Sequence, residues 1–141
     1  MKTLIPVLCT ITLLVVNCSK STETIAPSLY GTWKETTKSI TNCTTSAQNI
    51  AEGPCTNCVT LVLATGANNI NTWTSTSGPS SGTWGAGGPI TNATGIINFM
   101  TSGSLAVVTV SYIYTASTLE LVTDNGSPGP LCRETHKYTR Q

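Results

Sequence analysis

The pattern of apolar and polar positions along the chain predicts short β-strands rather than helices. Tyr112 and Tyr114 share one face of a segment whose other positions hold Ser, Ile and Thr. Leu119 and Leu121 share one face of the next segment, and residues 132–140 alternate two sets of side chains in the same way. A repeat of two residues is typical of a strand with two unlike faces. We therefore expect an all-β protein.

About eight strand-like segments follow one another, separated by turn-forming Gly, Pro, Asn and Ser. A polar stretch, 41–57, connects the first two segments and is expected to form a long loop. Many short strands with frequent turns favour a sandwich or a closed up-and-down barrel, and the periodicity alone does not choose between them. The predicted segments are 29–40, 58–64, 69–75, 83–84, 95–100, 104–117, 118–124 and 132–140.

An apolar run from Leu4 to Val16 lies ahead of these segments and follows Lys2. The run has about the length of a signal-peptide core and is shorter than the roughly 20 residues of a transmembrane helix. Val15-Val16-Asn17-Cys18 comes next and resembles the lipobox of bacterial lipoproteins, in which the cysteine after the cleavage site becomes acylated. Asn17 departs from the Gly, Ala or Ser usually found at its position in that motif.

The resemblance to a lipobox divides the chain into a lipoprotein signal peptide over 1–17, a lipidated cysteine with a polar tether over 18–28, and a folded domain over 29–141. It implies a protein of the bacterial cell envelope, anchored to the outer membrane, on its periplasmic or surface side, through acylated Cys18. Several acyl chains on one residue give stable anchoring. The alternative is an ordinary secretory leader cleaved nearby, which leaves Cys18 as a free thiol.

The chain is poor in charged residues. Of its 141 residues, 7 are Lys or Arg and 6 are Asp or Glu, which gives a net charge of +1. Its surface must therefore be built mainly from Thr, Ser, Asn and Gly. No basic stripe is present to neutralise phosphates, so nucleic acid is not expected as a partner. Disorder is not implied either, because disordered chains usually combine low hydrophobicity with high net charge.

Two motifs at opposite ends of the domain favour the barrel. Leu29-Tyr30-Gly31-Thr32-Trp33-Lys34 resembles the Gly-x-Trp motif that opens the first strand of lipocalins, and Tyr138-Thr139-Arg140 resembles the closing motif of small lipocalin-like lipoproteins. The resemblance implies a lipocalin-like, closed antiparallel barrel of about eight strands over 29–141. It also implies that Arg140 packs over Trp33, a cation–π contact of roughly 0.5–2 kcal/mol. Avidin-like barrels also begin with Gly-Thr-Trp, but no further match supports biotin binding.

The domain keeps four cysteines, Cys43, Cys55, Cys58 and Cys132. An even number of cysteines in an exported protein indicates disulfides, and four cysteines allow three pairings. A redox-active Cys-x-x-Cys motif and a four-cysteine zinc site are the alternatives. If the barrel implied by the resemblance pairs its first and last strands, Cys132 lies near position 41. This arrangement predicts the pairs Cys43–Cys132 and Cys55–Cys58.

Catalysis has few candidates in this sequence. His136 is the only histidine, and no nucleophile elbow, zinc-protease motif or phosphate-binding loop is present. His136 belongs either to an ordinary surface strand or to the barrel interior beside Glu134 and Tyr138. We expect no catalytic residues, no metal and no cofactor, and therefore no enzyme.

Four aromatic side chains are the candidates for a ligand cavity: Trp73, Trp84, Phe99 and Tyr112. An eight-stranded barrel has room for one small ligand or for packed side chains. The first alternative predicts a monomeric protein that binds a small apolar molecule, with the loop 41–57 as a lid over the barrel mouth. The second predicts a solid barrel that serves as a scaffold for protein interaction through its loops.

Overall fold

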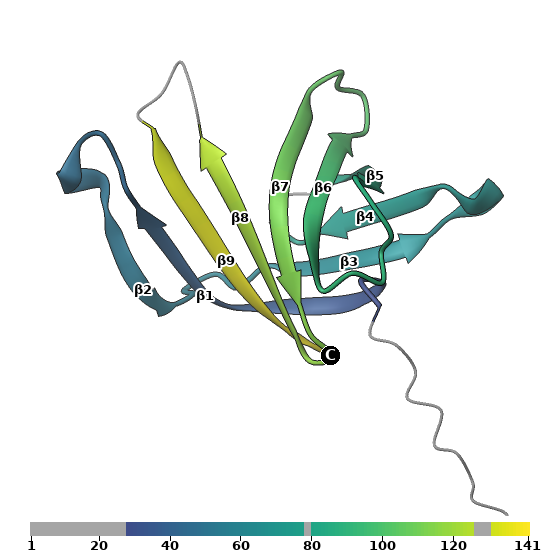
Figure 1. The fold of residues 1–141 in the computed structure, drawn as a ribbon, viewed down its shortest axis with the longest axis horizontal. Helices are drawn as coiled ribbons and strands as arrows, with labels where there is room; N and C mark the ends of the chain where they lie inside the picture. Colours follow the sequence, from purple (N-terminus) through teal and green to yellow (C-terminus); the bar gives the residue numbers. More distant parts are fainter. Residues whose placement is uncertain (1–27, 78–79, 126–130) are drawn as a thin grey trace, which may run out of the picture.

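The strands form one antiparallel sheet in which β3 to β9 pair in sequence order, while β2 and β3 both pair with β1 (Figure 1). The computed structural model describes residues 28–77, 80–125 and 131–141. Within these residues it contains two short 3₁₀ turns, η1 (Ser46–Gln48) and η2 (Ala67–Asn69). The strands are β1 (Gly31–Thr41), β2 (Ile50–Pro54), β3 (Thr60–Thr65), β4 (Asn71–Ser75), β5 (Ser80–Ala86), β6 (Thr94–Thr101), β7 (Val107–Tyr114), β8 (Thr118–Asn125) and β9 (Cys132–Arg140).

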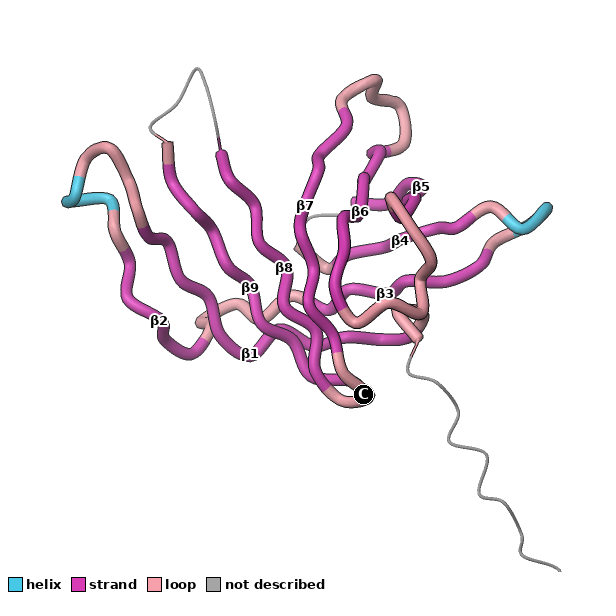
Figure 2. The backbone as a smooth tube through the Cα atoms, viewed as in Figure 1, coloured by secondary structure: helices cyan, strands magenta, loops and turns pink. Residues whose placement is uncertain are grey.

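The sheet closes on itself because β9 pairs with β1 as well as with β8. Their register runs from Trp33↔Arg140 to Thr41↔Arg133. The eight strands β1 and β3–β9 therefore form a closed up-and-down barrel, which confirms the predicted fold class. Because β1 is antiparallel to both β2 and β3, and β3–β9 then alternate in direction, the β1–β2 and β6–β7 connections lie at the same end of the barrel as the last residues of β4 and β8; we call this end the mouth (Figure 2). The other end, where the described chain begins and ends, is the closed end.

The expected loop 41–57 contains a strand, so this part of the prediction was wrong. β1 is longer than its pairing with β3, which covers only Gly31 to Lys34. Beyond that point β2 pairs with β1, from Thr37↔Pro54 to Ile40↔Ile50. An uncovered stretch of β1 would present an open sheet edge; β2 covers this stretch and takes its place as the edge strand. The segment thus extends the barrel wall and does not lie across the mouth as a lid.

The closed end is held by Arg140, whose Cζ lies 4.2 Å from the centroid of the Trp33 ring. Arg140 also donates through Nη1 to the carbonyl of Tyr30 at 2.8 Å, while Trp33 Nε1 donates to the carbonyl of Leu29 at 2.9 Å. Gly31 lies beneath the guanidinium, with φ +148, and a Cβ there would approach Arg140 Nη1 to 2.6 Å. The Gly-x-Trp motif and the late arginine are therefore parts of one contact.

Side chains fill the barrel interior above this contact. The polar atoms of the large aromatics are satisfied, since Trp84 Nε1 donates to the carbonyl of Thr72 at 3.0 Å and Tyr114 Oη to that of Ile90 at 2.9 Å. This half of the barrel is solid rather than hollow. The buried hydrophobic residues are Leu29, Trp33, Leu61, Leu63, Trp84, Ile97, Val110, Tyr112, Tyr114, Leu119, Leu121 and Tyr138.

Both predicted disulfides are confirmed. Cys43–Cys132 joins the residue two positions after β1 to the first residue of β9, across 89 positions of sequence. Cys55–Cys58 closes a local loop between β2 and β3. The β1–β9 pairing is therefore fixed at the mouth by a covalent bond and at the closed end by Arg140.

Replacing the closing arginine tests its contribution. Arg140→Ala removes the cation–π contact with Trp33 and the hydrogen bonds to the carbonyls of Tyr30 and Ala116. We expect a loss of about 2–4 kcal/mol in the free energy of unfolding, measured with urea. Arg133→Ala is the matched control, because its ion pair with Asp124 is exposed and should contribute little. Equal losses for the two variants would contradict the assigned role.

The two disulfides should differ in their contribution to stability. In the loop-entropy description, the 89-residue separation of Cys43–Cys132 corresponds to about 4–5 kcal/mol and the 3-residue separation of Cys55–Cys58 to about 2 kcal/mol. The double serine variants of each pair, compared by urea unfolding, measure this difference. A variant lacking Cys55–Cys58 that is the less stable of the two would contradict it.

Candidate binding site at the mouth of the barrel

An apolar pocket of about 220 Å³ opens at the mouth, above the packed interior. Its walls are Val59 and inward-facing residues of strands β3, β4 and β6–β9. The same faces continue toward the closed end as the buried core, so the pocket is the part of the interior that the core leaves unfilled. It is lined by Val59, Leu61, Trp73, Ser75, Phe99, Thr101, Val108, Leu121 and Tyr138.

Trp73 owes its position in the pocket to a glycine on the neighbouring strand. Gly82 pairs with Trp73, and a Cβ on Gly82 would lie 2.8 Å from Trp73 Nε1 and 1.8 Å from the carbonyl oxygen of Met100. The absence of that atom lets the indole donate to the Met100 carbonyl at 3.2 Å. The ring then meets Phe99 edge to face, with centroids 5.6 Å apart. An aromatic wall is therefore fixed in place before any ligand arrives.

The four aromatic candidates separate into two pairs. Trp73 and Phe99 line the apolar pocket. Trp84 and Tyr112 do not line it, because they lie nearer the closed end and are 5% and 2% exposed within the core. Alternation indicates which face a side chain occupies but not how far along the barrel it lies, so sequence reasoning could not separate the pairs.

A second pocket, of about 370 Å³, adjoins the first through Val59, which lines both. It lies against β1, β2 and the Cys55–Cys58 loop, and its walls include charged groups. The residues that line it are Glu35, Lys38, Ile50, Ala51, Gly53, Pro54, Cys55, Thr56, Asn57, Val59, Ser77 and His136.

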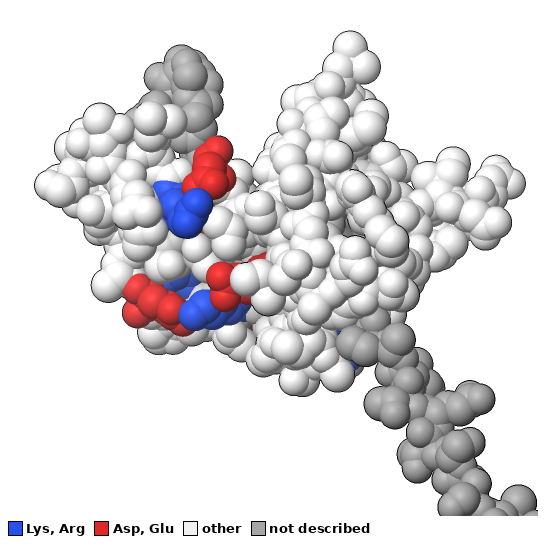
Figure 3. Space-filling model, in the orientation of Figure 1, with Lys and Arg blue, Asp and Glu red and all other residues white. Residues whose placement is uncertain are grey.

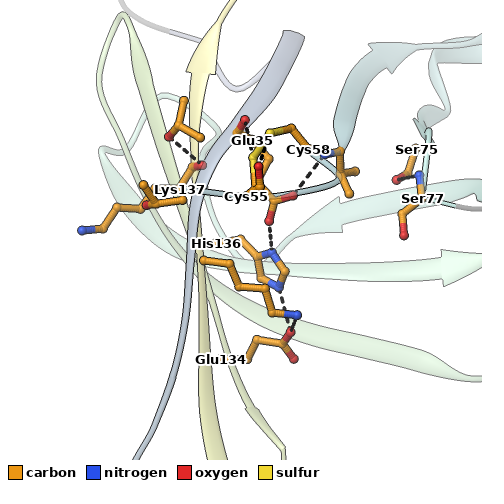
Figure 4. Close-up of polar contacts among 12 residues, drawn as sticks. Glu35, Cys55, Cys58, Ser75, Ser77, Glu134, His136 and Lys137 are labelled. Carbon is orange, nitrogen blue, oxygen red and sulfur yellow. Dashed lines mark hydrogen bonds and ion pairs between the residues drawn. A yellow bond between two sulfur atoms is a disulfide. The ribbon is translucent and has the colours of Figure 1, made fainter. Parts of the chain in front are cut away.

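Glu35 is the centre of the polar part. It is 4% exposed and is the buried charged side chain of the described residues. Its Oε1 lies 2.6 Å from His136 Nδ1, and its Oε2 accepts the backbone N–H of Val59 at 3.0 Å (Figure 4). His136 Nε2 lies 3.1 Å from Glu134 Oε1, and Lys38 forms an ion pair with the same carboxylate. We call Glu35, Lys38, Glu134 and His136 the mouth cluster.

A β-bulge in β1 brings these groups together. Glu35 pairs with Tyr138 and Lys38 pairs with His136, so four positions on β1 oppose three on β9, and Thr36 is the additional residue. Side chains three apart normally point to opposite faces of a strand, and a bulge turns both to the same face. Without it, Lys38 would point outward. No motif in the sequence marks this bulge, and the cluster was not predicted, although the placement of His136 beside Glu134 and Tyr138 was one of two alternatives considered.

Both ring nitrogens of His136 face carboxylate oxygens. Nδ1 is hydrogen-bonded to Glu35, and Nε2 lies 3.1 Å from a carboxylate oxygen of Glu134. The mouth cluster therefore places one imidazole between two carboxylates. In a nucleophile–His–carboxylate arrangement the second nitrogen faces a hydroxyl or thiol, whereas here it faces Glu134.

Tyr138 lies where the two parts of the site meet. Its ring stacks near that of His136, with centroids 6.3 Å apart, and it lines the apolar pocket. Burial raises the pKa of the Tyr138 phenol well above its usual value, and the nearby charges of Glu35 and Glu134 raise it further. The phenol is thus neutral at physiological pH.

The charged side chains gather on one side of the barrel (Figure 3). On the outer surface, Lys137 contacts Glu52 at 2.7 Å, and hydrogen bonds from Lys137 and Thr37 lower the pKa of Glu52. Residues 53–119 contain no Asp, Glu, Lys, Arg or His. Strands β3–β7 therefore present an uncharged wall, while β1, β2, β8 and β9 carry the charges.

Comparison with known proteins finds no matching protein-family model, no matching curated protein and no matching solved structure. Among the described residues, no three His, Cys, Asp or Glu side chains are grouped so that they could hold a metal ion. All four domain cysteines are in disulfides, so the zinc alternative considered from the sequence does not apply. No helix in the described part of the chain is long and apolar enough to span a membrane. Cys18 lies outside the described residues.

The raised pKa of Tyr138 predicts a specific response to alkali. Because the phenol ionises at lower pH in the unfolded chain than in the folded one, the stability that it contributes is complete below about pH 10 and decreases above it. Between pH 10 and pH 11, we expect the free energy of unfolding of Tyr138→Phe to decrease by about 1 kcal/mol less than that of the wild type. Urea unfolding at each pH measures this difference. Parallel pH profiles for the two proteins would contradict it.

Proposed function

We propose that this protein is an exported, lipid-anchored, lipocalin-like protein that binds one small, mostly apolar molecule at the barrel mouth. The observation that carries the proposal is the apolar pocket above an otherwise solid interior. Packing that excludes voids is the rule in protein interiors, so an open apolar pocket with fixed walls favours a binding role.

The walls suggest how the apolar part of a ligand would bind. Leu61 and Leu121 are buried beneath the pocket, while Trp73 and Phe99 stand at its side with part of their surface open. Aromatic rings held by neighbours offer a large apolar area at little cost in side-chain entropy. Its volume of about 220 Å³ is small for a ligand pocket, which favours a compact apolar group.

The mouth cluster supplies the polar counterpart. It offers carboxylate oxygens from Glu35 and Glu134 beside the N–H groups of His136 and Lys38, and Glu35, Lys38 and His136 line the adjoining pocket. A ligand whose apolar body enters the first pocket would direct its polar end toward this cluster. A few polar groups beside an apolar surface orient a ligand and give specificity.

Export and anchoring are supported by features of different kinds. Two disulfides are typical of proteins in oxidising compartments. The apolar run from Leu4 to Val16 and the segment that ends at Cys18 support a cleaved and acylated N-terminus. The closed barrel supports the resemblance carried by Gly31, Trp33 and Arg140.

A fluorescent probe tests the binding proposal. N-phenyl-1-naphthylamine is neutral and apolar, and its emission increases when it leaves water. Val108→Phe places a larger side chain in the pocket without disturbing the core, since Val108 is 48% exposed. We expect this variant to bind the probe at least about tenfold more weakly than the wild type, a change of about 1.4 kcal/mol.

Ile96→Phe is the matched control. Ile96 is 47% exposed and lies on the outer face of β6, next to the fully buried Ile97. Its affinity for the probe should equal that of the wild type. If the wild type does not bind the probe, or if both variants weaken binding equally, the pocket is not the site, and the solid-scaffold alternative takes its place.

A further inference from the structure

Exposed aliphatic side chains surround the mouth. Leu105 is 98% exposed in the β6–β7 connection, Leu131 is 61% exposed just before β9, and Ile50 is 54% exposed at the start of β2. Met100 and Val107, which flank the β6–β7 connection, are exposed as well. We call Ile50, Leu105 and Leu131 the rim residues. They lie on three separate connections at one end of the barrel.

The loop segments that carry the rim residues are uncharged. The segments 42–50 and 102–106, together with Leu131, contain no Asp, Glu, Lys, Arg or His. The exposed ion pair nearest to Leu131 in sequence is Asp124–Arg133, and Lys38 lines the polar pocket together with Ile50. Exposed aliphatics beside uncharged segments are expensive to leave in water.

The hydrogen-bonded wall of the barrel is interrupted between β7 and β8 at this end. β7 and β8 pair only from Tyr114↔Leu119 to Ser111↔Val122. Beyond this point β7 continues to pair with β6 as far as Val107, and β8 with β9 as far as Asn125, so the two strands separate toward the mouth (Figure 1). Val108 stands at this opening. It is half-exposed, and its side chain also lines the apolar pocket.

We propose that the rim docks on a bilayer of zwitterionic phospholipid, with Leu105 inserted at the boundary between headgroups and acyl chains. The opening between β7 and β8 then connects the lipid with the apolar pocket. The ligand class that follows is a lipid-like molecule taken from or delivered to the membrane, and this second step rests on the proposed function.

The distribution of the rim residues favours a bilayer over a second protein chain. A stable interface between two chains buries about 800 Å² on each in one continuous, well-packed patch. Here the aliphatics are spread around the mouth, in the β6–β7 connection and at the starts of β2 and β9, an arrangement that suits a soft surface. Neutral headgroups match the uncharged rim, whereas anionic membranes are recognised through clusters of Lys and Arg, which the rim lacks.

The expected anchor is compatible with this orientation. The described chain begins at the closed end, whereas the rim is at the mouth. A tether over 18–28 extends at most about 35 Å, and the nine residues of β9 span about 30 Å. An acylated Cys18 and the rim can therefore contact the same bilayer.

Tryptophan quenching tests the proposal with the full chain. Leu105→Trp and Ile70→Trp each add one indole, at the rim and at the closed end respectively, and Ile70 is a suitable control because it is also an exposed aliphatic, at 51%. The proteins are mixed with phosphatidylcholine vesicles that carry either ordinary or dibrominated acyl chains. Because every variant keeps the same N-terminal segment, a difference between the two reports which end of the barrel contacts lipid.

We expect brominated vesicles to reduce the emission of the added indole about twofold in Leu105→Trp, since an inserted rim lies roughly 5–10 Å into the boundary region. Ile70→Trp should be quenched no more than the wild type. Adding phosphatidylglycerol should not increase the quenching. Equal quenching at both positions, or stronger quenching at position 70, would overturn the proposal. So would a stable dimer that Leu105→Asp dissociates, because the rim would then be an interface between copies.

Binding of N-phenyl-1-naphthylamine without vesicles separates this proposal from the function on which its second step rests. Rim quenching without probe binding would leave the docking surface in place and remove the ligand route. Probe binding without a difference between Leu105→Trp and Ile70→Trp would leave the pocket and remove the docking surface.

Discussion

The pairing of β1 with β9 is the constraint on which the rest of the structure depends. A sheet of short strands that remained open would expose two edges of unpaired N–H and C=O groups. Here the edges satisfy each other, and the pairing is secured twice: by the Arg140 guanidinium over Trp33 at the closed end and by Cys43–Cys132 at the mouth. Because both ends are fixed, the positions of Glu35 and the other inward-facing groups of β1 follow from the pairing with β9 and from its one-residue shift at Thr36.

The same closure divides the interior into two regions of different character. Near Trp33 the large side chains of Trp84, Tyr112 and Tyr114 occupy the space. The indole N–H groups of Trp33 and Trp84 and the hydroxyl of Tyr114 donate hydrogen bonds to backbone carbonyls. Near the mouth, the core stops at Leu121, and the wall becomes part apolar and part charged. The packed core and the pockets thus lie at opposite ends of the barrel, so the pockets do not weaken the contact between Arg140 and Trp33 that closes it.

The sequence predicted the closed antiparallel barrel and both disulfides because these depend on short-range alternation and on two motifs at the ends of the domain. It could not predict that part of 41–57 forms β2, since Ile50–Pro54 is short, contains Gly53 and Pro54, and gives no strand pattern; its role comes from the length of β1. It also failed to indicate the depth of Trp84 along the barrel, or the bulge at Thr36 that assembles the mouth cluster. Both properties are set by tertiary register rather than by local composition.

The bulge at Thr36 also allows the residues of β1 at the mouth to change without affecting those at the closed end. A one-residue insertion or deletion in a strand normally reverses every side chain that follows it. In β1 such a change at position 36 would alter only the residues between it and the mouth, such as Lys38 and Ile40, while Gly31 and Trp33 would keep their places under Arg140. Descendants of this barrel could therefore acquire a differently charged entrance through one small length change, without having to rebuild the fold.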